Sequence, residues 1–264
     1  MDLQLTRKRA LVTGSTAGIG FATARLLAEE GAQIIVNGRT QARVDAAIAR
    51  IREACPEARV GGVAADLSGA EGVARLIAAC PDIDVLVNNL GIFDPVPFES
   101  IDDAAWFRFF EVNVMSGVRL ARQYLPQMKA HNWGRIIFIS SESGVCPPAE
   151  MVHYGMTKSA QLSISRGLAE TCVATGVTVN AVLPGPTRTE GVGEFFAKLA
   201  KEHNLSLAET ERRFFAEARP TSIIKRFIEP DEVAGAVVYL CSPRAAATNG
   251  AALRVEGGIV RSIV

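Results

Sequence analysis

The chain has 264 residues, of which 48% are hydrophobic and 21% are charged, so it is long enough to close a single α/β core. Lysine and arginine together number 28, as do aspartate and glutamate, and no long run of one sign occurs, which argues against a nucleic-acid surface or a polybasic membrane anchor. We find no secretory leader, membrane-spanning stretch or cysteine cluster of metal-ligand spacing, and expect a cytoplasmic protein with buried free thiols and no bound metal.

Short β-branched or aliphatic runs predict strands, and the stretches between them have the apolar spacing of helices. The predicted strands are 9–13, 33–37, 59–66, 84–89, 135–140, 177–183 and 251–258. They are continuously apolar, as expected when helices cover both faces of a parallel sheet. The pattern predicts one doubly wound α/β domain of the Rossmann type over residues 1–264, with about seven parallel strands.

A glycine-rich turn, "TGSTAGIG", follows the first predicted strand and opens the first helix. Gly14, Gly18 and Gly20 would let the backbone approach a ligand, and the helix N-terminus would face an anion such as a pyrophosphate. The spacing G-x3-G-x-G differs from the usual dinucleotide fingerprint, so an ordinary glycine-rich turn is the alternative.

The end of the second strand bears on the choice of nucleotide. Gly38 stands where NAD-binding proteins use an acidic side chain to hold the ribose, and Arg39 follows it. A guanidinium would pair with the 2'-phosphate of NADP(H), which is therefore favoured over NAD(H). The alternative is a solvated arginine at the start of a helix.

Polar residues also end the third and fourth strands, where ligands of parallel sheets gather. They are Asp66, with Leu67 beside it, and Asn88, Asn89 and Gly91 of "NNLG". Asp66 would serve equally well as the cap of the next helix.

Tyr154 and Lys158 of "YGMTK" are four positions apart, so a helix would place both side chains on one face. An ammonium group close to a phenol favours the phenolate and lowers the phenol pKa from its ordinary value near 10.

Residues 186–229 interrupt the alternation of strands and helices. Within them, "EFFAKLAKEHNLSLAETERRFFAEA" is helical in propensity and has an apolar face. That face comprises Phe195, Phe196, Leu199, Phe214 and Phe215. The segment would either pack against the domain or form a mobile lid over a substrate.

These motifs together resemble the classical short-chain dehydrogenase/reductase family over nearly the whole chain. The matches, in order, are "TGSTAGIG", "NNLG", Asn113 in "EVNV", the serine pair in "ISSES", "YGMTK", "LPGPTRT" and "RVEGG". The family's catalytic serine stands 13 residues before its tyrosine, which selects Ser141 over Ser140 and Ser143.

The resemblance implies a catalytic set of Asn113, Ser141, Tyr154 and Lys158. Tyr154 would be the general acid or base, and Lys158 would lower its pKa and hold the nicotinamide ribose. Ser141 would bond the substrate oxygen, and Asn113 would keep a water molecule in a proton relay.

The resemblance also implies a set of residues that hold the cofactor. Pro184, Gly185 and the hydroxyl of Thr187 or Thr189 would orient the nicotinamide carboxamide. The whole set is Gly14, Ser15, Thr16, Gly18, Ile19, Gly20, Arg39, Asp66, Leu67, Asn88, Asn89, Gly91, Tyr154, Lys158, Pro184, Gly185, Thr187 and Thr189.

The sequence departs from the family pattern at three kinds of position. Leu90 replaces the usual alanine of "NNAG", and Glu142 follows the catalytic serine. If Glu142 points into the pocket, its charge disfavours anionic substrates, and pointing into solvent is the alternative. Asn132 and Thr175 stand where 3-oxoacyl-(acyl carrier protein) reductases carry basic residues, which makes that substrate less favoured.

The sequence thus indicates an NADP(H)-dependent oxidoreductase that interconverts a small-molecule carbonyl and a secondary alcohol. The family resemblance implies a homotetramer, and neither nucleic acid nor a membrane is expected as a partner. The alternatives are a 3-oxoacyl-(acyl carrier protein) reductase and a non-catalytic nucleotide sensor.

Overall fold

The computed structural model of the chain describes residues 2–263 and contains one seven-stranded parallel sheet. The strand order is β3-β2-β1-β4-β5-β6-β7, as in doubly wound folds. The strands are β1 (Arg9–Val12), β2 (Gln33–Gly38), β3 (Val60–Ala64), β4 (Val85–Asn88), β5 (Gly134–Ile139), β6 (Val177–Pro184) and β7 (Ala252–Val255). All seven predicted strands are confirmed, and so is the fold class.

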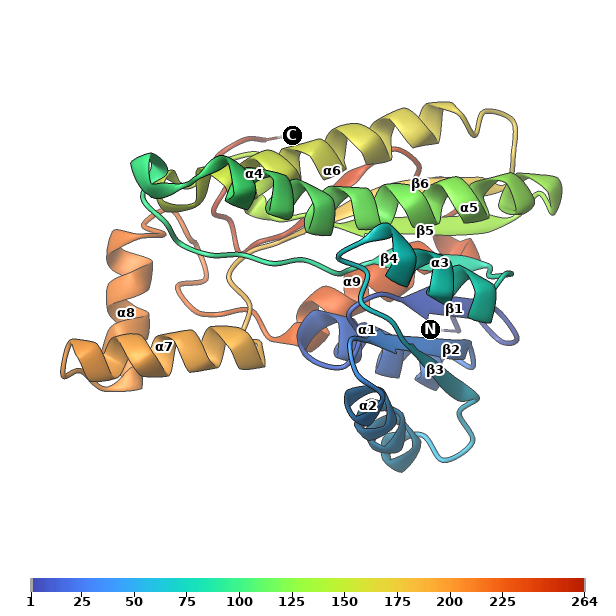
Figure 1. The fold of residues 1–264 in the computed structure, drawn as a ribbon, viewed down its shortest axis with the longest axis horizontal. Coiled ribbons are helices and arrows are strands. Elements are labelled where there is room, and N and C mark those ends of the chain that lie inside the picture. Colours follow the sequence, from blue (N-terminus) through green and yellow to red (C-terminus); the bar gives the residue numbers. More distant parts are fainter. Residues whose placement is uncertain (1, 264) are drawn as a thin grey trace.

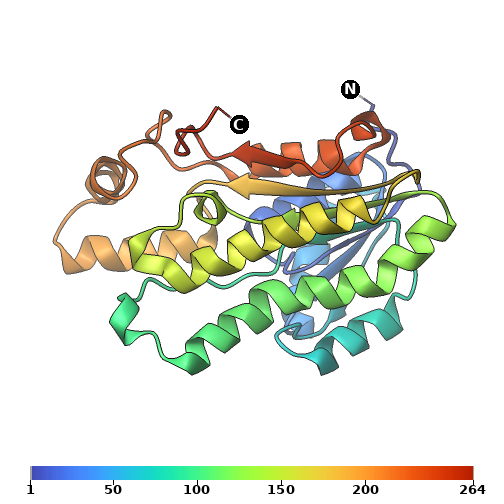
Figure 2. The same cartoon turned by 90° about the horizontal axis from the view of Figure 1, so that it is seen from above.

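The helices are α1 (Gly18–Glu29), α2 (Gln41–Ala54), α3 (Ala70–Ala79), α4 (Asp103–Phe110), α5 (Ser116–Ala130), α6 (Val152–Glu170), α7 (Glu190–Glu202), α8 (Leu207–Glu217) and α9 (Pro230–Cys241). One hydrophobic cluster joins α1, α2 and α9 to one face of the sheet, and a second joins α3, α5 and α6 to the other face. Figures 1 and 2 show these two helical layers on either side of the strands.

Alternation along β1 shows how the sequence builds both layers. Ala10 and Val12 belong to one cluster and Leu11 to the other, and all three are fully buried. A strand whose successive side chains enter two different cores has to be apolar at every position. The edge strands depart from this pattern, because Gly61 and Gly62 of β3 are exposed and so are the first residues of β7.

The predicted helical stretch in 186–229 is confirmed as helical and forms two helices, α7 and α8. Asn204 ends the first with a φ of 53°, in the left-handed region that asparagine tolerates better than most residues. Ser206 begins the second as part of a capping box with Glu209. Figures 1 and 2 show both helices projecting beyond the sheet, on the side toward which the strands point.

The segment after α8 is fixed against the turn that follows β7. The backbone N–H of Ile223 donates to the carbonyl of Gly257 at 2.8 Å. A Cβ atom at Gly257, whose φ is 68°, would lie 2.6 Å from Ile224. The C-terminal turn and the 186–229 segment therefore support each other.

Three cysteines, Cys80, Cys172 and Cys241, are buried, and Cys55 is partly buried. Cys146 is exposed, so the expectation of buried thiols is wrong at that position, which lies in a loop. All five thiols are free. Across residues 2–263, we find no helix with the length and apolar character that crossing a membrane requires.

Candidate active site

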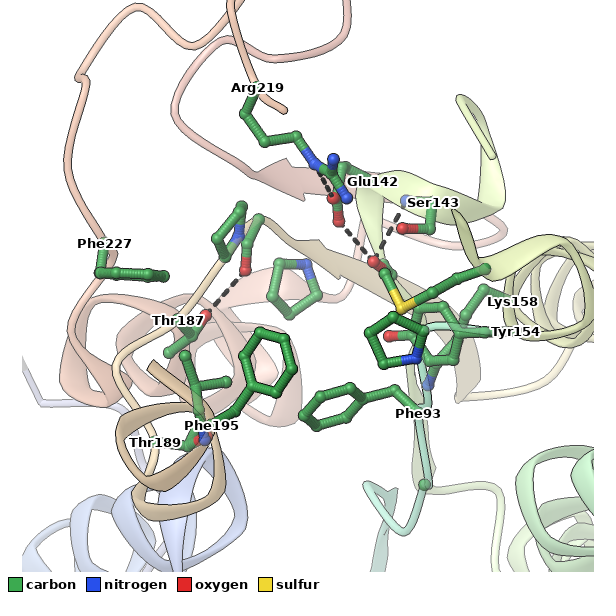
Figure 3. A pocket seen from close by; sticks show the side chains of 18 of the residues that line it. Phe93, Glu142, Ser143, Tyr154, Lys158, Thr187, Thr189, Phe195, Arg219 and Phe227 are labelled. Carbon is green, nitrogen blue, oxygen red and sulfur yellow. Dashed lines mark hydrogen bonds and ion pairs between the residues drawn. The ribbon is translucent and has the colours of Figure 1, made fainter. Parts of the chain in front are cut away.

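A cavity of about 440 Å³ lies at the carboxyl ends of the central strands, between the sheet and helices α7 and α8. Its walls are largely aromatic and aliphatic, with Tyr154 and Lys158 on one side and Thr187 and Thr189 on the opposite side (Figure 3). The aromatic lining comprises Phe93, Phe195, Phe196, Phe214 and Phe227. Three of these phenylalanines belong to the predicted apolar face of residues 186–229, so that segment encloses part of the cavity.

Tyr154 and Lys158 lie one turn apart on α6, and both line the cavity, as the four-residue spacing predicts. The Nζ atom of Lys158 is 5.5 Å from the centre of the Tyr154 ring and donates to the carbonyl of Ile139 at 2.9 Å. Lys158 is buried, with 4% of its surface exposed. The end of β5 therefore fixes the lysine beside the tyrosine.

The pKa values of this pair differ from the sequence-based expectation. Burial raises the pKa of Tyr154 above 10, and the nearby Glu142 carboxylate raises it further, against smaller lowering effects of Ser141 and Arg219. Burial also lowers the pKa of Lys158 to about 7, against the opposing effect of Glu142. The expected net lowering of the tyrosine pKa is therefore wrong for this structure, because burial and the Glu142 carboxylate raise it.

The structure separates the three serines that follow β5. The hydroxyl of Ser140 donates to the backbone carbonyl of Lys158 at 2.8 Å and is thereby engaged in the fold. The Ser141 hydroxyl contacts Tyr154, and its oxygen accepts the backbone N–H of Ser143 at 3.1 Å. Ser141 is thus the serine that lies against the tyrosine, in agreement with the spacing argument.

Glu142 points inward, which settles the orientation that the sequence left open. It is 5% exposed, and it accepts a hydrogen bond from the hydroxyl of Ser141. Its other carboxylate oxygen lies 3.4 Å from Nε of Arg219, 77 positions later in the chain. Arg219 also pairs with Glu150 at 3.0 Å, so a chain of polar contacts crosses one wall of the cavity (Figure 3).

Asn113 lies behind the tyrosine and lysine in a π-helical turn, Glu111–Met115, between α4 and α5. Its side chain bonds both backbone groups of Ile92, at 2.7 and 3.0 Å, and the hydroxyl of Thr157 at 3.0 Å. Its backbone carbonyl accepts from the Gln161 side chain at 2.6 Å. Asn113 thus joins the strand-end segment to α6, and it does not line the cavity.

The glycine turn is held open by close packing around Gly14 and Gly20. Gly14 has a φ of 59°, and a Cβ atom at Gly20 would lie 2.5 Å from the Gly14 carbonyl and would also meet Asn89. The Asn89 side chain donates to the carbonyls of Thr13 and Gly14 at 2.9 and 3.1 Å. The glycines therefore leave the N-terminus of α1 open toward a second cavity that shares Ile19, Asn89 and Thr189 with the first.

Several residues of the predicted cofactor set are engaged within the fold. Ser15 is buried and bonds Val12 and Asn37. The Asn88 side chain packs against Gly117 of α5, on the opposite side of the strand from Asn89. Asp66 is exposed and bonds the backbone of Ser68, and Leu67 is buried in the core. Because α3 is capped at Gly69, the helix-cap alternative for Asp66 is wrong.

Arg39 is exposed just after β2, and Thr16 packs against the glycine that precedes it. A Cβ atom at Gly38 would lie 2.5 Å from Cγ2 of Thr16, so the position favoured for an acidic ribose ligand is sterically closed here. Arg43, two residues into α2, lines the second cavity. No ion pair of either arginine is found among residues 2–263.

The segment after β6 borders both cavities. Pro184, Gly185 and Thr187 line the first, and Thr189 lines both. The Thr187 hydroxyl donates to the Gly185 carbonyl at 2.9 Å, and Thr189 caps α7 and packs against Gly18. These residues and the predicted Gly91, which lies against Lys158, meet at the junction of the two cavities.

Four residues of this region escaped sequence reasoning. The sequence could have indicated Arg43, because it is a second basic residue four positions after Arg39. Asn37, which bonds the Gly14 backbone at 3.2 Å, and Gln161 sit in regular elements and carry no motif signal. Arg219 reaches the cavity only through tertiary folding.

Known proteins share this architecture. A family model described as short chain dehydrogenase matches residues 8–200. The uncharacterised oxidoreductase YvaG of Bacillus subtilis (strain 168) is 53% identical over 263 residues, covering 100% of both chains. D-beta-hydroxybutyrate dehydrogenase of Cupriavidus necator is 35% identical, covering 97% of this chain and 99% of that protein. The crystal structure of L-sorbose reductase from Gluconobacter frateurii, complexed with NADPH and L-sorbose, has a TM-score of 0.93 at 32% identity, covering 100% of both chains.

The family model spans most of the chain, and the relatives match it almost from end to end. The same parallel sheet with two helical layers is found in the solved structure. The chain therefore belongs to the short-chain dehydrogenase/reductase family and is an oxidoreductase.

Proposed function

We propose that the protein is an NADP(H)-dependent reductase of small carbonyl compounds, or a secondary alcohol dehydrogenase in the reverse direction. The observation that carries this proposal is the meeting of Ser141, Tyr154 and Lys158 on one wall of an apolar cavity that adjoins the glycine turn. NADPH bound along the glycine turn would supply the hydride. The protein's own groups would hold the carbonyl and deliver the proton.

In this mechanism Tyr154 donates its phenolic proton to the carbonyl oxygen. A raised pKa keeps the phenol protonated at neutral pH, which suits a general acid in the reduction direction. Lys158 stabilises the phenolate left behind and holds the ribose hydroxyls, and Ser141 bonds the substrate oxygen. Asn113 fixes the strand-end backbone that borders Lys158, and its role in a water relay stays a prediction.

NADP(H) is favoured over NAD(H) by the charges beside the second cavity. Arg39 and Arg43 would pair with a 2'-phosphate, and packing against Thr16 disfavours an acidic side chain at Gly38. The solved L-sorbose reductase complex contains NADPH, which supports the same preference. For eight of the other predicted cofactor residues, the proposed contacts rest on their position in the lining of the two cavities: Gly18, Ile19, Asn89, Gly91, Pro184, Gly185, Thr187 and Thr189.

A 3-oxoacyl-(acyl carrier protein) reductase is the narrower alternative. Asn132 and Thr175 lie in turns at the amino-terminal ends of β5 and β6, and neither supplies charge for an acidic carrier. Asn132 is instead engaged with the backbone of Gly176 at 2.7 Å. A nucleotide sensor without catalysis is not favoured, since Ser141 and Tyr154 are in contact.

We also propose that the domain comprises the whole of residues 1–264, acts in the cytoplasm and assembles as a homotetramer. Exposed apolar side chains on α4 and β7 favour such pairing: Phe107 is 74% exposed and Leu253 is 36% exposed. Light scattering after size-exclusion chromatography should give the mass of four chains. A monomeric mass would contradict the assembly.

The proposed reaction is tested by following NADPH absorbance against a panel of ketones, ketosteroids, sugars, quinones and 3-oxoacyl thioesters. Oxidation that depends on a carbonyl substrate, together with a matching alcohol product, supports the proposal. Tight NADPH binding without turnover of any member of the panel would favour the sensor instead.

A further inference from the structure

The two carboxylate oxygens of Glu142 have different partners. Oε1 faces Nε of Arg219 at 3.4 Å, and Oε2 accepts the hydroxyl proton of Ser141. Glu142 and Arg219 are 5% and 8% exposed. The Ser141 hydroxyl has one proton, and its oxygen already accepts the backbone N–H of Ser143. The hydrogen bond from Ser141 to Glu142 therefore competes with any hydrogen bond from Ser141 to a substrate.

In the proposed reaction Ser141 has to turn its proton toward the substrate carbonyl. Oε2 of Glu142 then loses its donor inside a buried wall, and an unpaired buried carboxylate oxygen is costly. A substrate that carries its own hydrogen-bond donor can replace the Ser141 hydroxyl as the partner of Oε2. The donor has to come from an atom close to the carbonyl, because Ser141 and Glu142 are adjacent in the chain.

We propose that Glu142 is a specificity-determining residue that accepts a hydrogen bond from a hydroxyl group on the carbon next to the substrate carbonyl. The substrate class is then the uncharged α-hydroxy ketones, with vicinal diols as the corresponding alcohols. This inference rests on the proposed function, and it names the substrate class of the same site.

The Arg219 guanidinium already has two carboxylate partners. It faces Glu142 from the segment after α8 (Figure 3), and it also pairs with Glu150 at 3.0 Å. A substrate carboxylate at this position would face Glu142 instead of a free cation. The charges around Arg219 thus select a neutral group.

The opposite wall determines what the rest of the substrate is. Phe93 and Phe195 lie across the cavity from Glu142 and Arg219, and Phe227 closes one side (Figure 3). These rings offer no hydrogen bond, so they suit an apolar substituent on the other side of the carbonyl. An aromatic α-hydroxy ketone combines both requirements.

The test compares an α-hydroxy ketone with two controls, one of nearly the same shape and one of similar electronic character. They are 2-hydroxyacetophenone, its isostere propiophenone, and 2-methoxyacetophenone, whose oxygen withdraws electrons in the same way but carries no proton. We expect kcat/KM with NADPH to be at least about tenfold higher for the hydroxy ketone than for either of the others, which corresponds to about 1.4 kcal/mol. Because each variant is judged by the ratio of kcat/KM between two ketones, a loss of turnover that affects all ketones equally does not change the result.

Three variants locate the effect. Glu142→Gln should bring the hydroxy-to-methoxy ratio to within about threefold of one, because the amide oxygen turns to Arg219 and an N–H faces the substrate. Glu170→Gln is the matched control, since it makes the same chemical change in the ion pair with Arg166 on α6, lines neither cavity and should keep the wild-type ratio. If Glu142→Gln fails to fold, the paired variant Glu142→Leu with Arg219→Leu removes both charges together.

Two results would overturn the inference. An equal kcat/KM for the three ketones in the wild-type enzyme excludes a hydroxyl acceptor and leaves the carbonyl reductase proposal intact. A preference for the hydroxy ketone that survives in both Glu142 variants assigns the acceptor to another group. If NADPH binds but no ketone of any class is reduced, the proposed function and this inference fail together.

Discussion

The ammonium nitrogen of Lys158 faces the ring of Tyr154 from 5.5 Å while it donates to the carbonyl that ends β5. The lysine is thereby held by backbone of the sheet, and its distance from the phenol is fixed by one turn of α6. Because both groups are desolvated, their neutral forms are favoured together. The phenol is thus protonated at neutral pH, which suits it to give a proton to a substrate in the reduction direction.

Replacement of Tyr154 by phenylalanine should reduce kcat for ketone reduction by at least about a thousandfold, since the proton donor is lost and the ring is kept. NADPH should still bind, which fluorescence titration would show. The matched control is Tyr239→Phe on α9, an exposed tyrosine that does not line either cavity and should keep its activity. Near-normal turnover in Tyr154→Phe would remove this residue from the mechanism.

Lys158 should make the folded state more stable as the pH rises from about 7 toward 10. Its pKa is lowered to about 7 in the folded protein and is near 10.5 in the unfolded chain, so the unfolded state binds more protons in this window. Below pH 7 both states are protonated, and the cost of burying the charge is fully present. Urea unfolding at pH 7 and pH 9.5 should show a gain of about 3 kcal/mol over the change seen in Lys158→Met. A parallel pH dependence in the two proteins would contradict the lowered pKa.

Arg39→Asp should shift cofactor preference toward NADH, because the new carboxylate repels a 2'-phosphate and accepts a ribose hydroxyl. We expect the ratio of kcat/KM for NADPH over NADH to fall by at least about tenfold. Arg39→Lys retains the positive charge and serves as the control. An unchanged ratio in Arg39→Asp would leave Arg43 as the residue that reads the phosphate.

Gly20→Ala should weaken NADPH binding by at least about tenfold, since the added methyl group would meet the Gly14 carbonyl and the Asn89 side chain and force the turn to move. Gly235→Ala in α9 is the control, because nothing lies within 4 Å of its added methyl group. The control should bind NADPH normally and gain up to about 1 kcal/mol of stability from helix propensity. Isothermal titration with NADPH distinguishes these outcomes, and equal affinities would contradict the close packing.

Arg219→Met should lower the free energy of unfolding by about 3 kcal/mol, because Glu142 would stay buried without its cation. The double variant Arg219→Met with Glu142→Leu should recover most of the loss. Urea unfolding of the two single variants and the double variant measures the coupling. Additive losses would show that the two groups do not stabilise each other.

Local patterns predicted the fold well, because each strand of this sheet is marked by its own apolar residues. These patterns were less informative about which side of a strand each side chain faces. Asn88 and Asn89 are neighbours in one motif, yet they point to opposite sides of β4, and only Asn89 reaches the glycine turn. The break at Asn204 was missed since asparagine is also compatible with a helix.

The site was predictable where spacing along a helix defines it, as for Tyr154 and Lys158. Its electrostatics were not, because the groups that set them come from distant parts of the chain. Arg219 follows Glu142 by 77 positions, and no local pattern pairs the two. The pKa of Tyr154 depends in the same way on burial in the folded chain and on the distant Arg219.

The hydrogen bond between Ile223 and Gly257 implies an order of events during protein synthesis. The glycine turn and the first six strands are complete long before the ribosome adds Gly257. The segment after α8, which carries Arg219, can form its hydrogen bond to Gly257 only after the turn that follows β7 has been synthesised. We therefore expect a nascent chain to form the glycine turn before Arg219 and the cavity wall around it are held in place.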